Sequence, residues 1–374
     1  MAVKPSSTSS SKPRAGAPWG LLTAAVLVLV LELVLRLLNP TGAVARYSAG
    51  HEFAYRAVPF EIQQGVGDVV IVGSSRARRG VLAPLLREAL EKRGLPSSVK
   101  NFSLNAAQAE ELELVVRQLV EAQPRPKLLV WAITARELEE RERRPSSYVR
   151  YLARPTHWVS ARREGRAGVD GYLPEAIRNE AARWSYVARS RFAVRHLLSG
   201  RGTEDDEDQV VESLAGAFVP TSAAPTPMQG AMPSSALSSK RNASRKVSSA
   251  RIKKYLGDAY TQRNWPHNYQ AEHLESAVRE ARRLGVPVLL VEIPVSDQLE
   301  KQMPRGTQKK FRRYLAEVGR RHQVPFVPVQ DLAASFEPRD FLEYSHLNYR
   351  GSVKYTEALA PLVIQGLEAQ AKRR

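Results

Sequence analysis

The chain of 374 residues contains no cysteine. This absence excludes disulfide bonds, thiolate metal sites and a cysteine nucleophile. It says little about the compartment, because cysteine-free chains occur on both sides of a membrane. No zinc-finger spacing and no aromatic RNA-binding motif are present either. The formal net charge of +18 would suit nucleic acid, an anionic membrane surface or an acidic polymer. Because the arginines are scattered and often stand beside glutamate, we expect no nucleic-acid partner, and the sequence shows no metal or cofactor site.

One long hydrophobic run is present, at residues 19–38. Its length matches the hydrocarbon core of a bilayer, so we expect a single transmembrane anchor. The tail 1–18 is basic, which predicts that it stays cytoplasmic and that the rest of the chain is periplasmic, at the inner membrane. The alternative is a cleaved signal peptide, because Ala43-Val44-Ala45 resembles a cleavage site. Both interpretations place the remainder outside the cytoplasm.

A single acidic residue, Glu32, interrupts this run. It precedes Arg36 by four residues, so the two can pair on one helix face. A contact with the transmembrane helices of a partner is the functional alternative. Both interpretations stay open.

The rest of the chain alternates strand-like and helix-like segments. Such alternation predicts an α/β fold, a three-layer sandwich of the flavodoxin-like type around a central parallel sheet of about five strands. The predicted strands are 68–72, 99–104, 127–133, 286–295 and 324–329, and the predicted helices are 81–92, 106–121, 269–284, 309–321 and 351–367.

A large insertion divides this pattern. We expect a linker at 39–66 and then one domain over 67–374, interrupted at 140–267. The insertion carries a predicted helix at 175–198. Its low-complexity part, 200–250, cannot bury enough apolar area to order itself, and we predict disorder there. A polymer-binding flap is the functional alternative.

The turn Gly73-Ser74-Ser75 follows the first predicted strand. A serine at this place lies at the carboxyl end of a parallel sheet, where open α/β sheets bind ligands. The helix that follows can offer backbone N–H groups to an anion. The alternative is that the two serines only cap this helix.

A histidine, His346, stands in a short loop before the last predicted helix. Glu343 lies three residues upstream, close enough for its carboxylate to hold the imidazole Nδ1–H. Together with a serine from the first turn, these residues would supply nucleophile, base and orienting group. A lone histidine is more often structural, but of the seven in the chain only His346 has this arrangement on a late loop.

These two motifs resemble the first and last blocks of the SGNH/GDSL hydrolase superfamily. The nearest likeness is to its membrane-anchored extracytoplasmic branch, which includes proteins of teichoic acid D-alanyl transfer and alginate O-acetylation. The resemblance covers the α/β core and implies that Ser75 is the nucleophile, His346 the base and Glu343 the orienting acid. It implies that Asn348 shapes the loop of the last block and the start of the final helix. It also implies that Ser74 takes the place of the family's aspartate.

The middle blocks depart from the family's pattern. Asn105-Ala106-Ala107 stands where the resemblance implies an oxyanion glycine, so Asn105 or a backbone N–H would have to serve. No asparagine follows the third strand, where Thr134 is the nearest candidate donor. The positive charge of Arg76, beside the proposed nucleophile, favours an anionic acceptor. The alternative interpretation is that Arg76 is only a solvated residue at the start of a helix.

The sequence therefore predicts a membrane-anchored extracytoplasmic serine esterase or O-acyltransferase. Its expected substrate is an acylated or anionic glycan of the cell envelope, and an expected partner is a membrane-bound O-acyltransferase. The alternative is a catalytically inactive accessory protein of the same fold that serves a membrane acyltransferase or a polysaccharide export system. The departures in the middle blocks favour that alternative.

Overall fold

The computed structural model describes residues 18–38, 58–59, 61–139, 152–163, 173–185, 187, 248–256, 260 and 265–372. The helices are α1 Pro18–Leu38, α4 Ser75–Gly80, α5 Ala83–Lys92, α6 Ala109–Glu121, α8 Pro155–Arg163, α9 Leu173–Trp184, α13 Ser249–Leu256, α14 Tyr269–Arg283, α15 Asp297–Glu300, α16 Thr307–His322 and α17 Tyr349–Ala371. The strands are β1 Val69–Gly73, β2 Val99–Asn101, β3 Leu128–Ile133, β4 Val288–Glu292 and β5 Phe326–Val327.

The five strands form one sheet in the order β2-β1-β3-β4-β5. Every neighbouring pair is parallel. The predicted α/β class and the parallel sheet of about five strands are therefore confirmed. The chain leaves β1 toward β2 on one side and returns to β3 on the other. Such a reversal opens a crevice at the carboxyl ends of β1 and β3, where doubly wound sheets bind ligands.

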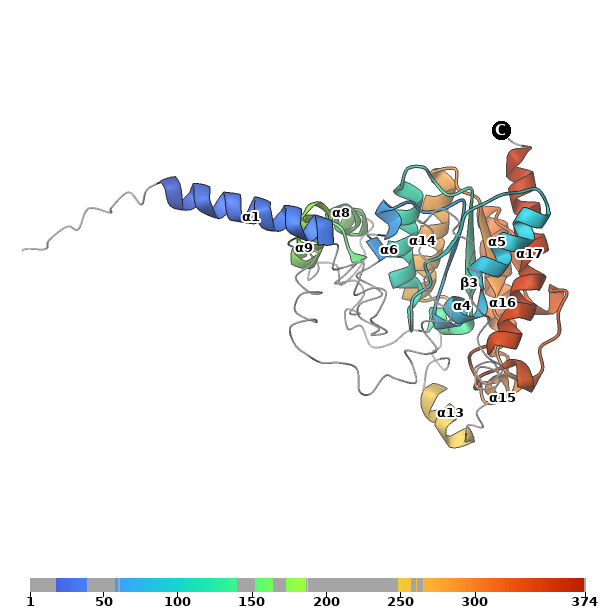
Figure 1. The fold of residues 1–374 in the computed structure, drawn as a ribbon. Coiled ribbons are helices and arrows are strands. Elements are labelled where there is room, and N and C mark those ends of the chain that lie inside the picture. The colour runs from blue at the N-terminus through green and yellow to red at the C-terminus, as the bar shows by residue number, and fades with distance from the viewer. Residues whose placement is uncertain are drawn as a thin grey trace, which may run out of the picture.

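Helices cover both faces of the sheet, and each face has its own apolar core (Figure 1). Strand β3 shows why, because its side chains alternate between the two cores. Leu129 and Trp131 pack with α6, α14 and α16, whereas Val130 and Ala132 pack with α5 and α17. All six residues of β3 are buried, which explains the unbroken apolar run in the sequence.

Several elements differ in extent from the prediction. The turn after β1 becomes a helix at once, so Ser75–Gly80 forms the short α4, and α5 begins only at Ala83. Val81 and Leu82, both in an extended conformation, separate the two helices. The strands are shorter than their apolar runs. Strand β2 ends at Asn101, although Phe102 N and Leu104 N still donate to the carbonyl oxygens of Ile71 and Gly73 in β1.

Helix α1 extends away from the sheet, with its C-terminal end beside α9 (Figure 1). Glu32 pairs with Arg36 at 3.3 Å. Its second oxygen also accepts hydrogen bonds from Ser185 Oγ and from the backbone N–H of Val187, both at 3.0 Å. The side chain is therefore satisfied inside this chain. None of the helices in the described ranges combines the length and the apolar character needed to cross a membrane, so the predicted span at 19–38 lacks support from the structure.

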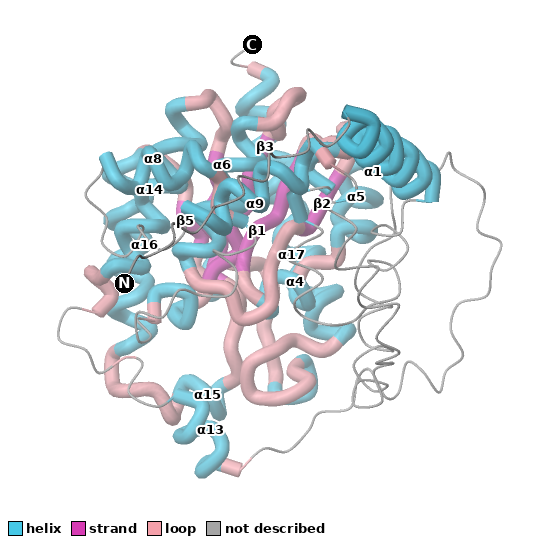
Figure 2. Tube along the Cα trace, turned by 90° about the vertical axis from the view of Figure 1, so that its left-hand side faces the viewer, coloured by secondary structure: helices cyan, strands magenta, loops and turns pink. Residues whose placement is uncertain are grey.

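The insertion contributes α8, α9 and α13 among the described residues. Figure 2 shows that the magenta strands lie at the centre of the molecule, while α13 lies apart from them beside α15. Nearly all of the predicted cytoplasmic tail, most of the predicted linker and nearly all of the segment 200–250, which we predict to be disordered, lie outside the described residues.

Candidate active site

The turn after β1 depends on a glycine. A Cβ on Gly73 would lie 2.3 Å from the carbonyl oxygen of Ala132 and 2.5 Å from the Cβ of Ala77. No side chain fits there, and the close approach lets α4 start directly at the end of the strand. Ser74 is the residue that precedes α4, but its side chain makes no capping hydrogen bond. Ser75 is the first residue of the helix.

The side chain of Ser75 meets His346 across 271 positions of sequence. The distance between Ser75 Oγ and His346 Nε2 is 2.8 Å. Serine hydroxyl and imidazole nitrogen are therefore in hydrogen-bond reach, which is the geometry required of a nucleophile and its general base.

The loop that carries His346 is a short hairpin. Phe341 and Leu347 form an antiparallel bridge, and Leu342 N donates to the carbonyl oxygen of His346 at 2.9 Å. Ser296, which follows β4, donates through its Oγ to the carbonyl oxygen of Tyr344 at 2.7 Å. The hairpin is thus held both by its own ladder and by the sheet.

Two contacts fix α17 against α4 and hence the base against the nucleophile. Ser352 Oγ donates to the carbonyl oxygen of Arg79 at 2.8 Å. Leu82 N donates to Thr356 Oγ1 at 3.0 Å. Both hydroxyl groups lie in the first two turns of α17, immediately after the hairpin. These contacts hold the start of α17, and with it the hairpin that precedes it, against α4 and the segment that follows α4.

Glu343 orients the imidazole. Its Oε1 pairs with His346 Nδ1. Ser345 Oγ donates to the same oxygen at 2.7 Å and lies 3.0 Å from Nδ1. A carboxylate at Nδ1 favours the tautomer with its proton on that nitrogen, which leaves Nε2 free to accept the proton of Ser75. The structure thus brings the three predicted catalytic side chains into one hydrogen-bonded chain.

The electrostatics favour a neutral base. Burial lowers the pKa of His346 below its ordinary 6.5, and the charges of Arg79 and Arg76 act in the same direction, against the opposing effect of Glu343. Burial acts to raise the pKa of Glu343, but the hydrogen bond and charge of His346, with help from Ser345 and Arg76, bring it below its ordinary value. At neutral pH the pair is therefore a carboxylate and a neutral imidazole, which is the state a general base needs.

Arg76 does not face solvent. It is 2 % exposed, and its guanidinium donates to Thr134 Oγ1 at 2.8 Å. Both residues follow neighbouring strands, β1 and β3, so the contact spans the crevice between them. Because the charge of Arg76 also acts on His346 and Glu343, it is an electrostatic component of this site.

A buried carboxylate, Glu137, lies under the same turn. It is fully buried and accepts from the backbone N–H of Ser74 at 3.3 Å and from Trp131 Nε1 at 3.4 Å. Burial raises the pKa of Glu137 to about 7, against the opposing effects of Ser74 and Arg76. Our sequence reasoning missed this residue, because it stands in a charged stretch that looks solvated.

The segment after β2 approaches the site from the other side. Leu104 N donates to the carbonyl oxygen of Gly73 at 2.9 Å, which brings Asn105 and Ala106 beside the serine turn. Ala106 has a φ of 54°, a left-handed conformation that favours glycine. The glycine implied by the resemblance is absent, but the backbone geometry that suits a glycine is present here.

Asn348 serves the loop rather than an open site. Its Oδ1 caps α17 by accepting from Gly351 N at 3.0 Å, and its Nδ2 donates to the carbonyl oxygen of Arg339 at 2.8 Å. Asp340, fully buried, holds the base of the hairpin through Lys354 at 2.7 Å. Neither Asp340 nor Ser345 was a predicted site residue. In the sequence, nothing marks Asp340 as a buried residue that holds the base of the hairpin.

No protein-family model matches the chain, and no curated protein matches it. Among the residues that the structure describes, no group of three or more acidic or histidine side chains is arranged to hold a metal ion.

Proposed function

We propose that this protein is a serine esterase or O-acyltransferase of the SGNH type. The observation that carries the proposal is the chain Ser75–His346–Glu343, with 2.8 Å between the serine oxygen and Nε2. The strand order, which is that of flavodoxin-like sheets, and the place of Ser75 at the switch point support it further.

The reaction would proceed in two acyl transfers. Ser75 Oγ attacks the acyl carbonyl, and His346 Nε2 takes the hydroxyl proton while Glu343 stabilises the imidazolium. The bond to the leaving alcohol then breaks, and His346 returns the proton to that oxygen. In the second transfer, water or a glycan hydroxyl attacks the acyl-enzyme. His346 takes the proton of the attacking group and gives it to Ser75 Oγ as the ester bond to the serine breaks.

The oxyanion would be stabilised by backbone donors. The candidate donors are Ser75 N, at the start of α4, and the N–H groups of the turn at Asn105 and Ala106, which follows the contact of Leu104 N with Gly73. Losing one such donor typically costs a factor of about 10²–10³ in rate. The left-handed Ala106 supports a role of this turn, since its conformation is one that L residues seldom adopt without cause.

The substrate class is an acylated glycan of the cell envelope, and the site belongs at a membrane surface. Supporting this, α1 exposes most of its apolar side chains, such as Leu29 at 67 % and Leu37 at 78 %. We place the domain in the periplasm with residues 19–38 as the anchor and a membrane-bound O-acyltransferase as a partner. Fractionation of cells tests this placement: the full chain should sediment with inner membranes, and a variant lacking residues 1–38 should not.

Labelling with a fluorophosphonate probe tests the catalytic assignment. The wild type should react, and Ser75→Ala should not. Ser74→Ala is the matched control, because it removes the neighbouring hydroxyl and keeps the turn. Equal labelling of wild type and Ser75→Ala would remove Ser75 as nucleophile.

A second candidate is an inactive accessory protein of the same fold. The observation that favours it concerns Thr134, the nearest replacement for the missing asparagine donor. This residue is 2 % exposed and its Oγ1 accepts from Arg76 at 2.8 Å, so it lies in a buried contact rather than open to a substrate. Complementation of a deletion strain separates the two: full rescue by both Ser75→Ala and His346→Ala would make catalysis unnecessary.

A further inference from the structure

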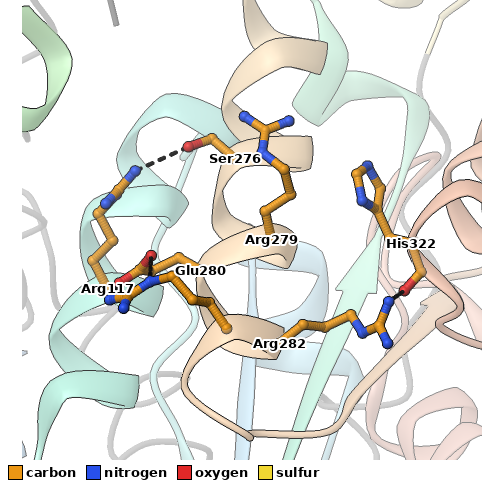
Figure 3. Close-up of a pocket in the computed structure, with 7 residues that line it drawn as sticks. Arg117, Ser276, Arg279, Glu280, Arg282 and His322 are labelled. Carbon is orange, nitrogen blue, oxygen red and sulfur yellow. Dashed lines mark hydrogen bonds and ion pairs between the residues drawn. The ribbon is translucent and has the colours of Figure 1, made fainter. Parts of the chain in front are cut away.

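A pocket of about 550 Å³ lies far from the serine and is rich in arginine. It lies between α6, α14 and α16, and four arginines line it together with one carboxylate, that of Glu280: Arg117, Arg279, Arg282 and Arg283. Figure 3 shows Arg279 in the middle of the pocket, with Arg117 on one side and Arg282 and His322 on the other.

The pocket lies at the opposite edge of the sheet from Ser75. Arg282 and Arg283 end α14, which leads into the first residues of β4. His322 ends α16, which leads into β5. In a parallel sheet these positions mark the amino ends of the strands, whereas Ser75 follows the carboxyl end of β1. A ligand here would therefore not compete with a substrate at Ser75.

Ion pairs and hydrogen bonds within the chain hold two of the arginines in place. Arg117 donates to Glu113 and to Ser276 Oγ, both at 2.9 Å. Arg283 pairs with Glu280 at 2.7 Å. These two positive charges are compensated by carboxylates. Their guanidinium groups are fixed before any ligand arrives, which reduces the entropy lost on binding.

The positive charges of the other two arginines are not compensated by a carboxylate in the described ranges. Arg282 donates only to neutral acceptors, the carbonyl oxygen of His322 and Gln323 Oε1. The side chain of Arg279 makes no hydrogen bond or ion pair with any residue in the described ranges. The pocket therefore presents two uncompensated positive charges on planar donor groups, and such groups bind the oxygens of phosphate in pairs.

We propose that this pocket is a binding site for a multiply charged oxyanion of the phosphate type, with Arg279 as its main contact. Its volume lies in the range of small-molecule sites. The two uncompensated arginine charges support a multiply charged anion, and the location of the pocket supports a role separate from that of the serine.

Isothermal titration of the full-length protein with pyrophosphate tests this site. We expect saturable binding of one pyrophosphate per chain. Arg279→Gln should weaken it by about tenfold or more, since one charge-assisted contact is lost. The fold should survive, because this side chain holds no described residue in place; circular dichroism checks that. Arg93→Gln, an exposed arginine at the end of α5 on the other face of the sheet, is the matched control and should bind as the wild type does.

Four results would overturn the proposal. The first is the absence of saturable binding to the wild type. The second is equal affinity in the wild type and Arg279→Gln. The third is tighter binding of a trigalacturonate than of pyrophosphate, because that would assign the site to carboxylates. Ser75→Ala should bind pyrophosphate as the wild type does, and a loss there would place the anion at the catalytic edge instead.

Discussion

Replacing Glu343 by glutamine tests how the base is oriented. The substitution keeps the length of the side chain but removes the negative charge that stabilises the imidazolium of His346. In serine hydrolases the equivalent loss costs a factor of about 10⁴ in kcat, which corresponds to roughly 5 kcal/mol of transition-state stabilisation. We expect a loss of that order in the hydrolysis of p-nitrophenyl acetate, with an unchanged melting temperature.

Ser345→Ala is the matched comparison for this prediction. It removes one hydrogen bond from a hydroxyl to the Glu343 carboxylate and keeps the negative charge. Such a bond contributes about 1.5–3 kcal/mol, so the expected loss is about 12- to 160-fold. The large difference between the two variants separates the charge of Glu343 from simple packing of the loop. A Glu343→Gln enzyme within tenfold of the wild type, when Ser75→Ala is inactive, would refute the orienting role.

The pH profile gives this prediction a second readout. The hydrogen bond and charge of Glu343 raise the pKa of His346 against the effect of burial. Without that carboxylate the pKa of His346 falls further. The acid limb of kcat/KM, which reports the neutral imidazole, should therefore move to lower pH in Glu343→Gln. A shift to higher pH would contradict the assignment.

Three further predictions concern the surroundings of the serine. Arg76→Gln removes a charge that lowers the pKa of His346, so the acid limb of kcat/KM should move to higher pH, opposite to the effect of Glu343→Gln. Glu137 has a pKa near 7 in the folded protein and near 4.5 unfolded, so its contribution to stability is fully present below pH 4.5 and is lost as pH rises to about 7. In urea titrations the wild type should lose about 3 kcal/mol relative to Glu137→Gln across that window, and parallel curves would contradict the burial argument. Gly73→Ala should cost about 3 kcal/mol of unfolding free energy because its Cβ meets Ala132 and Ala77; Gly94→Ala, where nothing lies within 4 Å, should cost only about 1–2 kcal/mol.

Much of the fold followed from local pattern. The β-branched runs and the amphipathic segments between them have clear periods, and parallel pairing follows from their alternation. The candidate triad followed too, because the serine turn and the carboxylate-x-x-histidine loop lie at positions where this topology brings them together. Its chemical role stays a prediction.

Other features depend on tertiary contacts that have no local signal. Glu137 stands in a run of charged residues, and only the packing of β3 against the serine turn shows that it is buried. Arg76 looked like a surface residue for the same reason. The left-handed conformation of Ala106 could not be predicted either, because no glycine stands in that turn. The arginine pocket joins residues from α6, α14 and α16, whose individual charges look like solvated helix faces in the sequence.

Trapping the acyl-enzyme tests the central claim most directly. The protein is mixed with p-nitrophenyl acetate, quenched in acid during the first turnovers, digested and mapped by mass spectrometry. The account predicts a single acetyl group on Ser75, present in the wild type and absent in His346→Ala. An acetyl group on another residue in the wild type, or turnover with no acetylated Ser75, would contradict it.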